Sequence, residues 1–145
     1  RVGLAGAAGF SGDISSLSEE VLERLKFHVD FYKVWRSNIF NSKAYLLTTP
    51  AELKDNKGWA AYQLQDINND VNLVFIYRLD DSVKKKYFYL CGLKPDMKYK
   101  VWKQDESETD AQVLRGEQLM NEGICVELSN RYNGEIFIVV GCQES

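Results

Sequence analysis

The stretch VNLVFIYRL, residues 71–79, is apolar at both odd and even positions. The stretch EIFIVV, residues 135–140, shares this property. A strand with one solvated face alternates between apolar and polar residues, whereas a strand covered on both faces does not. We therefore predict that these two segments are central strands of a sheet. The side chains predicted to be mostly buried on them are Leu73, Phe75, Tyr77, Ile136, Ile138 and Val140.

The rest of the chain also reads as strands from Ala44 onward. Apolar residues recur there at alternate positions, and turn sequences separate the runs at the spacing of an antiparallel sandwich. We predict a mainly β fold: an antiparallel β-sandwich of about seven strands, preceded by one long amphipathic α-helix and a remnant barrel strand. The predicted strands are Ala44–Thr49, Gly58–Asp66, Val71–Leu79, Lys86–Cys91, Lys98–Lys103, Ile124–Leu128 and Glu135–Gly141.

Turn sequences mark the connections between these strands. Lys57-Gly58, Asn68–Asp70 and Lys94–Asp96 have turn composition, and Asn133-Gly134 between two apolar runs predicts a hairpin.

Two further segments lie between the predicted strands. The acidic stretch Gln104–Asp110 has no apolar residue and is predicted to be a mobile loop. The stretch Leu114–Met120 is followed by Gly123, which favours one or two helical turns ended by a glycine cap.

Residues Ser18–Phe40 are predicted to form a long amphipathic helix. Ser18 is a candidate N-cap, and Glu19 and Glu20 place negative charge in the first turn. We expect the side that carries Trp35 to pack on the sandwich and part of the apolar stripe to be exposed or covered by another molecule. The stripe at helical spacing consists of Leu22, Leu25, Val29, Tyr32, Trp35 and Ile39.

The N-terminal run VGLAGAAGF, residues 2–10, has a glycine at every third position. Neither the dinucleotide fingerprint nor the P-loop motif is present, so we interpret the small residues as those of a tightly packed barrel strand. Residues 1–41 are then a remnant of the last β/α unit of a (β/α)8 barrel, and residues 42–145 form the sandwich domain. Without its barrel, the segment 1–14 should be disordered or pair with a sandwich edge or a second copy.

The charge balance argues against several classes of partner. With 18 basic and 21 acidic residues the net charge is −3, so no electrostatic footprint for nucleic acid is present. No apolar run approaches the roughly 20 residues of a spanning helix, and no signal-peptide pattern is found. Lys84–Lys86 follows two aspartates and is predicted to be a solvated hairpin tip.

The cysteines and the histidine predict no metal and no cofactor. Cys91, Cys125 and Cys142 are widely spaced in apolar runs, which favours small buried side chains in a reducing compartment, the cytoplasm, over disulfides or a zinc site. His28 is the one histidine, lies in the predicted helix, and is expected to have a surface or packing role.

The carboxylates do not assemble into an obvious catalytic pair. Asp66, Asp70 and Asp96 have turn contexts, where aspartate usually accepts hydrogen bonds from nearby backbone. Asp30 faces away from the helical stripe. Asp13 follows the barrel-like strand, near the face at which barrel active sites lie. One carboxylate does not make the pair that glycoside hydrolysis needs.

Three tryptophans and eight tyrosines raise the question of a carbohydrate-binding surface. Flat aromatic rings can form a platform on which sugars stack, and the candidates are Trp59 and Trp102. The competing interpretation is that these aromatic residues are core residues, because they share strands with other apolar side chains.

Several segments together resemble glycoside hydrolase family 36, the bacterial α-galactosidases. VGLAGAAGF, Gly12-Asp13, LSEE at 17–20 and FYK at 31–33 are similar to the last barrel strand, its loop and the last barrel helix of that family. Three later stretches resemble segments of that family's C-terminal antiparallel β-sandwich domain: LVFIYRL at 73–79, LCGLKPDMKY at 90–99 and LRGEQLMNEG at 114–123.

The resemblance implies a parent enzyme that cleaves terminal α-linked galactose with retention, through two aspartates on earlier barrel strands. Those motifs are not in this chain, so we expect no catalytic residue here and no activity from the fragment. Gly12 and Asp13 would lie at the rim of the parent's active site and contact substrate. The implied partner is the catalytic barrel, which this domain would stabilise, and copies could also associate through the helix and N-terminal strand. The alternative function is a carbohydrate-binding or protein-interaction module.

Overall fold

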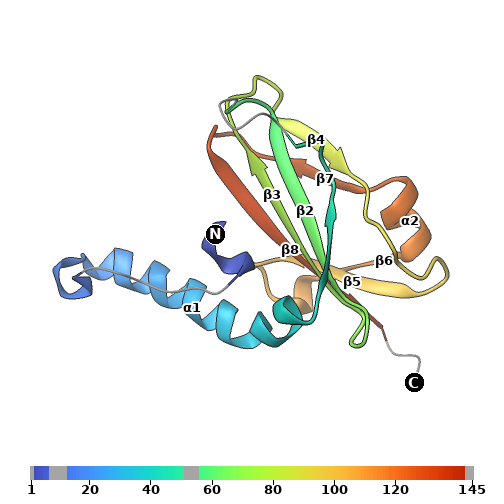
Figure 1. Ribbon diagram of the computed structural model, residues 1–145, viewed down its shortest axis with the longest axis horizontal. Helices are drawn as coiled ribbons and strands as arrows, with labels where there is room; N and C mark the ends of the chain where they lie inside the picture. The colour runs from blue at the N-terminus through green and yellow to red at the C-terminus, as the bar shows by residue number, and fades with distance from the viewer. Residues whose placement is uncertain (1, 7–12, 51–55, 143–145) are drawn as a thin grey trace.

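The computed structural model describes residues 2–6, 13–50 and 56–142. It is mainly β, with antiparallel sheets, one long helix and one short helix (Figure 1). The helices are α1 (Glu19–Phe40) and α2 (Gly116–Asn121), with short 3-10 helices at Val2–Ala5, Ile14–Ser16 and Glu108–Asp110. The strands are β1 (Lys43–Leu46), β2 (Trp59–Asp66), β3 (Val71–Arg78), β4 (Lys85–Phe88), β5 (Lys98–Lys103), β6 (Gln112–Arg115), β7 (Ile124–Glu127) and β8 (Asn133–Gly141).

Six strands form the larger sheet, in the order β1-β2-β3-β8-β5-β6, and β4 pairs with β7 in a second, two-stranded sheet. The prediction that the apolar stretches 71–79 and 135–140 are central is confirmed, because β3 pairs with β2 and β8, and β8 pairs with β3 and β5.

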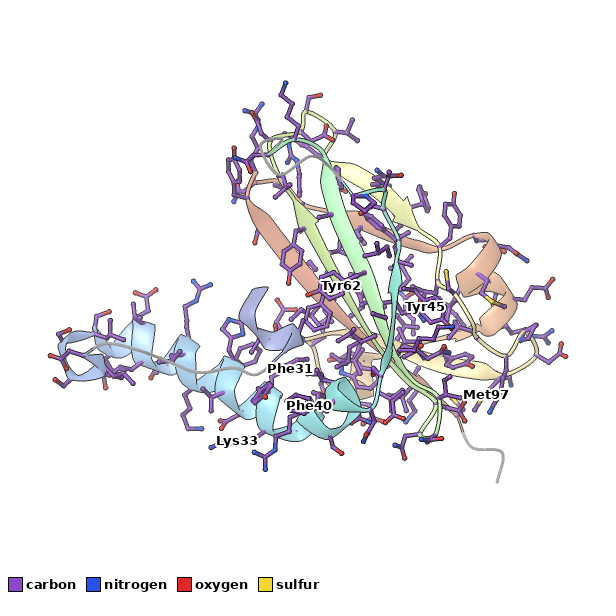
Figure 2. All side chains as sticks on the ribbon, viewed as in Figure 1. Phe31, Lys33, Phe40, Tyr45, Tyr62 and Met97 are labelled. Atoms are coloured by element: carbon purple, nitrogen blue, oxygen red, sulfur yellow. The ribbon has the colours of Figure 1, made fainter. Side chains whose placement is uncertain are left out.

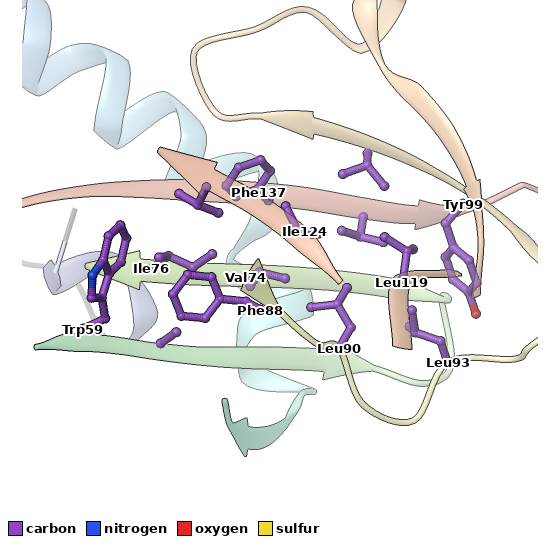
Figure 3. Packing of buried hydrophobic residues seen from close by; sticks show 14 of the residues in the cluster. Trp59, Val74, Ile76, Phe88, Leu90, Leu93, Tyr99, Leu119, Ile124 and Phe137 are labelled. Carbon is purple, nitrogen blue, oxygen red and sulfur yellow. The ribbon is translucent and has the colours of Figure 1, made fainter. Parts of the chain in front are cut away.

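One face of the larger sheet forms the sandwich core against β4, β7 and α2. Val74 and Ile76 of β3 and Phe137 of β8 point into this layer, where they meet Phe88 and Leu119 (Figure 3). The alternate side chains of β3 and β8 point to the other face and pack with Phe31 and Ile39 of α1. The predicted burial is confirmed for Leu73, Phe75, Ile136 and Ile138, while Tyr77 and Val140 are half-buried.

The prediction for the long helix is also confirmed. Helix α1 begins at Glu19 and ends at Phe40, with Ser18 as N-cap, although the Ser18 side chain makes no capping hydrogen bond. The N-terminal half of α1 projects beyond the edge of the sheet (Figure 1). Within residues 2–6, 13–50 and 56–142, no helix is both long and apolar enough to span a membrane.

The N-terminal segment differs from the expectation where the structure describes it. Residues Val2–Ala5 form a 3-10 helix, and Leu4 is buried in the same apolar cluster as Phe31. The segment is therefore not paired as a strand there, and Leu4 is covered by the cluster that includes α1. Residues 7–12 of the predicted strand lie outside the described residues.

The region after β5 contains a strand that the sequence did not predict. Strand β6 pairs with β5 at the edge of the sheet, and its Val113 is exposed. The loop before β6 carries a 3-10 helix at Glu108–Asp110, and Lys100 makes an ion pair with Glu108. The glycine cap is confirmed, since α2 is followed by Gly123 at φ +77°.

The predicted hairpin at Asn133-Gly134 is wrong. Strand β7 pairs with β4 and β8 pairs with β3 and β5, so the connection crosses from one sheet to the other. Gly134 lies within β8, where a Cβ atom would come within 2.5 Å of the Tyr77 ring. The glycine is required by close packing rather than by a two-residue turn.

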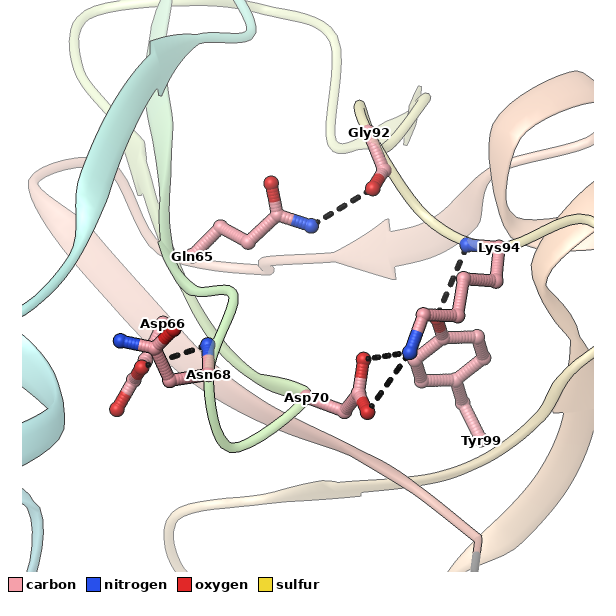
Figure 4. Close-up of polar contacts among 7 residues, drawn as sticks. All are labelled: Gln65, Asp66, Asn68, Asp70, Gly92, Lys94 and Tyr99. Carbon is pink, nitrogen blue, oxygen red and sulfur yellow. Dashed lines mark hydrogen bonds and ion pairs between the residues drawn. The ribbon is translucent and has the colours of Figure 1, made fainter.

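Hydrogen bonds from side chains hold the segment that follows β4. This strand was predicted to continue to Cys91 but ends at Phe88. The buried Gln63 side chain accepts from the Cys91 N–H and donates to its carbonyl, and Gln65 donates to the Gly92 carbonyl (Figure 4). Glutamine side chains thus replace the strand partner that this backbone lacks.

Two predictions about small surface features need correction. Cys125 is exposed and Cys91 and Cys142 are half-buried, so the cysteines are not fully buried core residues. Cys91 lies in the segment after β4 and Cys142 directly follows β8, while Cys125 lies on the outward side of β7, where alternation places it away from the core. The run Lys84–Lys86 is exposed as predicted, but it leads into and starts β4 rather than forming a hairpin tip.

Candidate docking face and tyrosine hollow

The apolar stripe of α1 is covered over only part of its length. Its C-terminal half packs on the larger sheet, with the Trp35 ring 6.5 Å from the Trp102 ring and Ile39 buried. Asn38 donates a 3.0 Å hydrogen bond to the buried Asp66 carboxylate, which also accepts from Asn69 in the β2–β3 turn. The helix is therefore fixed to the end of β2 that carries Asp66.

The N-terminal half of the stripe has no such cover from the described residues. Val21 and Leu22 are 46% and 36% exposed. Leu25 and Val29 are only half-buried. An apolar helix face of this kind usually packs against another surface. We call Val21, Leu22, Leu25 and Val29 the overhanging stripe.

The two tryptophans predicted as a sugar platform are both core residues. Trp59 is 6% exposed, packs on Phe88 and donates from its indole N–H to the Val83 carbonyl. Trp102 is 8% exposed and lies beneath Trp35. Neither ring presents a face on which a sugar could stack in this fold, because the pairing registers of β2 and β5 direct both rings into the core.

The Asp13 carboxylate is exposed and caps a short 3-10 helix. It accepts from the Ser15 N–H at 2.9 Å and from the Ser15 hydroxyl, and these hydrogen bonds lower the pKa of the Asp13 carboxyl. A carboxylate in this state is an acceptor and not a proton donor at neutral pH. Gly12, the other residue predicted at the parent's rim, lies outside the described residues.

His28 has a packing role in α1. Its ring makes an edge contact with Phe27, and its Nδ1 lies 3.1 Å from the buried Gln104 amide. Among the described residues, no three His, Cys, Asp or Glu side chains gather as a metal site would require. The three cysteines and His28 thus lie in separate parts of the described fold.

A hollow of about 470 Å³ lies at the other end of β2 from Asp66. Tyr62 lies on the same sheet face as α1, above Phe31 (Figure 2). Its ring stacks on Phe75 at 5.0 Å and is tilted against the Tyr77 ring at 6.4 Å. We call this site the tyrosine hollow. Its lining is Ala60, Tyr62, Tyr77, Arg78, Leu79, Tyr132 and Asn133.

Sequence reasoning missed the tyrosine hollow. Tyr132 stands in a polar turn, and Tyr62 and Tyr77 look like core residues because they occur in apolar runs. The available signal was the alternation within β2, where Ala60 and Tyr62 share one face and the neighbouring Ala61 and Gln63 point to the other.

The fold is that of a β-sandwich domain whose long helix is only half covered by the described part of its own sheet. The chain belongs to the glycosyl hydrolase family 36 C-terminal domain family, whose model matches residues 59–139, more than half of the chain. The resemblance seen in the sequence is thereby confirmed. A comparison with curated protein sequences finds no match.

Solved structures of α-galactosidases share this fold. The family 36 α-galactosidase AgaA from Geobacillus stearothermophilus aligns with a TM-score of 0.79 at 22% identity, over 96% of this chain and 18% of that chain. The α-galactosidase from Lactobacillus brevis aligns with a TM-score of 0.74 at 24% identity, over 92% and 18% respectively. The galactosidase domain of the α-galactosidase-sucrose kinase AgaSK gives 0.72 and 24%, over 88% and 17%. This chain therefore spans less than a fifth of the proteins whose fold it shares.

Proposed function

We propose that this chain is the non-catalytic C-terminal part of a retaining α-galactosidase, and that it stabilises the catalytic barrel. The observation that carries the proposal is the overhanging stripe of α1, an apolar surface that the described residues leave uncovered. The catalytic barrel of a family 36 enzyme is the partner part of such a domain. Residues 1–41 would then belong to the barrel and residues 42–145 to the sandwich.

The proposal gives the N-terminal residues a role in the intact enzyme. Gly12 and Asp13 would lie at the rim of the barrel's active site and contact an α-galactoside. The two aspartates that perform the reaction would come from the barrel. In the absence of the barrel, the overhanging stripe would drive association between copies of this chain.

The test compares three proteins with an aryl α-galactoside as substrate: the longer polypeptide that contains this chain, the same polypeptide truncated before Arg1, and this chain by itself. We expect turnover only from the longer polypeptide, because a retaining reaction needs two carboxyl groups about 5 to 5.5 Å apart. The truncated polypeptide should lose solubility or melt at a lower temperature. Turnover by this chain that disappears in Asp13→Ala, or a truncated polypeptide of unchanged stability, would contradict the proposal.

A further inference from the structure

The tyrosine hollow has the size and lining of a small-ligand site. Its volume, about 470 Å³, lies within the range of known ligand pockets, which are concave, mostly apolar and rimmed by a few polar groups. Tyr62 and Tyr77 line it with neighbouring rings, and the small Ala60 lies opposite Tyr77 on the adjacent strand. Asn133 adds a side-chain amide, whose Oδ1 accepts from the Gly134 N–H and whose NH2 can donate to a ligand.

The charge in the lining of the hollow is buried rather than presented to solvent. Arg78 is the charged side chain among its described lining residues, and it is 2% exposed. Its guanidinium donates to the backbone carbonyls of Leu128 and Ser129, at 2.6 and 2.9 Å, and to that of Asp81. Burial raises the pKa of the Tyr62 phenol, so this hydroxyl is neutral at physiological pH. An uncharged ligand suits such a lining, because the Arg78 guanidinium is buried and already donates to backbone carbonyls.

The exposed wall of the hollow is held in place before any ligand arrives. Tyr132 is 69% exposed and has a left-handed backbone conformation, with φ +56°. The loop that carries it is fixed by Arg78 on one side and by an ion pair between Arg131 and Asp80 on the other. Because hydrogen bonds already hold the backbone of this loop, binding at the hollow costs little loop entropy.

We propose that the tyrosine hollow binds a neutral hexose unit of a saccharide. The apolar face of the sugar ring would stack on Tyr132 against the wall formed by Tyr62, and the Asn133 amide would hydrogen-bond a ring hydroxyl. Uncharged rings with an apolar face and peripheral hydroxyls match a lining that is aromatic, neutral and polar at its edge. The proposal concerns a surface of this chain on the same sheet face as α1, and it requires the hollow to stay open in the intact enzyme.

The experiment is saturation-transfer NMR of the purified chain with galactose, glucose and raffinose, followed by titration to obtain Kd. The test variants are Tyr132→Ala, which removes the exposed ring, and Ala60→Leu, which fills the hollow while keeping every aromatic residue. The matched control is Tyr87→Ala, because Tyr87 is a similarly exposed tyrosine on β4 of the other sheet. Thermal melting of each variant reports whether the fold is kept.

We expect at least one of the three sugars to bind the wild-type chain. Tyr132→Ala should raise Kd about tenfold, the effect of losing one aromatic contact. Ala60→Leu should weaken binding similarly, and Tyr87→Ala should leave it unchanged. No saturation transfer from the wild-type chain to any of the sugars would overturn the proposal. So would equal losses in Tyr132→Ala and Tyr87→Ala. If Tyr132 is instead protected from chemical labelling in the longer polypeptide, the hollow is a protein contact and the proposal is wrong.

Discussion

The two faces of the six-stranded sheet are covered by different elements among the described residues. The face that carries Val74 and Ile76 is closed by β4, β7 and α2 into a continuous core. The face that carries Phe75 is covered by α1 and Leu4, and the N-terminal half of the helix projects past the sheet edge (Figure 1). Among the described residues, the difference lies in the covering layer, because α1 leaves part of its own apolar stripe exposed.

The strongest test of this comparison is the loss of one large side chain on each face. Phe75→Ala and Phe88→Ala should each lower the free energy of unfolding by about 3 to 5 kcal/mol, because both side chains are fully buried and leave cavities. Chemical denaturation measures the difference. A melting temperature unaffected by Phe75→Ala would mean that β3 is peripheral and that the face covered by α1 contributes no core.

A smaller effect is expected from a glycine in the closed layer. A Cβ at Gly116 would lie 2.1 Å from the Lys94 carbonyl oxygen, so Gly116→Ala should cost about 1 to 3 kcal/mol through overpacking. The control is Gly6→Ala on the α1 side, where no atom lies within 4 Å of the added Cβ. Equal melting temperatures for the two variants would show that the closed layer has more freedom than this packing allows.

The smallest expected effect concerns the ion pair that ties the β2–β3 turn to the segment before β5. Lys94 donates to the Asp70 carboxylate at 3.0 Å, and this hydrogen bond raises the pKa of Lys94 (Figure 4). The stabilisation is therefore complete below the pKa of an unfolded lysine and is lost as pH rises through the higher folded value. Because Lys94 is exposed, the effect on stability is slight.

Asp70→Asn tests this pair without straining the turn, since asparagine also tolerates the positive φ of residue 70. NMR titration of the Lys94 ammonium should give a lower pKa in the variant than in the wild-type chain. Identical titration curves would show that the ion pair does not persist in solution.

The elements with strong patterns could be predicted from the sequence. Residues 71–79 and 135–140 are apolar at both parities, and that pattern arises only when both faces of a strand are covered. The helix from Glu19 to Phe40 was visible from its apolar spacing and its acidic first turn. In each case many residues support the same conclusion, so single exceptions do not matter.

The remaining features depend on contacts between distant segments. Strand β6 is short, lies at an edge and exposes Val113, so its sequence lacks a burial pattern. Trp59 and Tyr132 are both aromatic, yet one is buried and the other exposed because sheet pairing sets the direction of the first and a pinned loop sets that of the second. Composition carries no information about either contact. Of the two candidate sites, the sequence therefore predicted the exposed stripe of the helix but not the tyrosine hollow.

The most direct test of the proposal for the overhanging stripe is amide hydrogen exchange along α1, measured in this chain and in the proposed full-length enzyme. Two segments are compared: residues 21–29, which carry the overhanging stripe, and residues 32–39, which pack on the sheet. We predict faster amide exchange at residues 21–29 than at residues 32–39 in this chain. In the proposed full-length enzyme, we predict strong protection of residues 21–29. Equal exchange of residues 21–29 in the two proteins would contradict the proposal that the barrel covers the overhanging stripe.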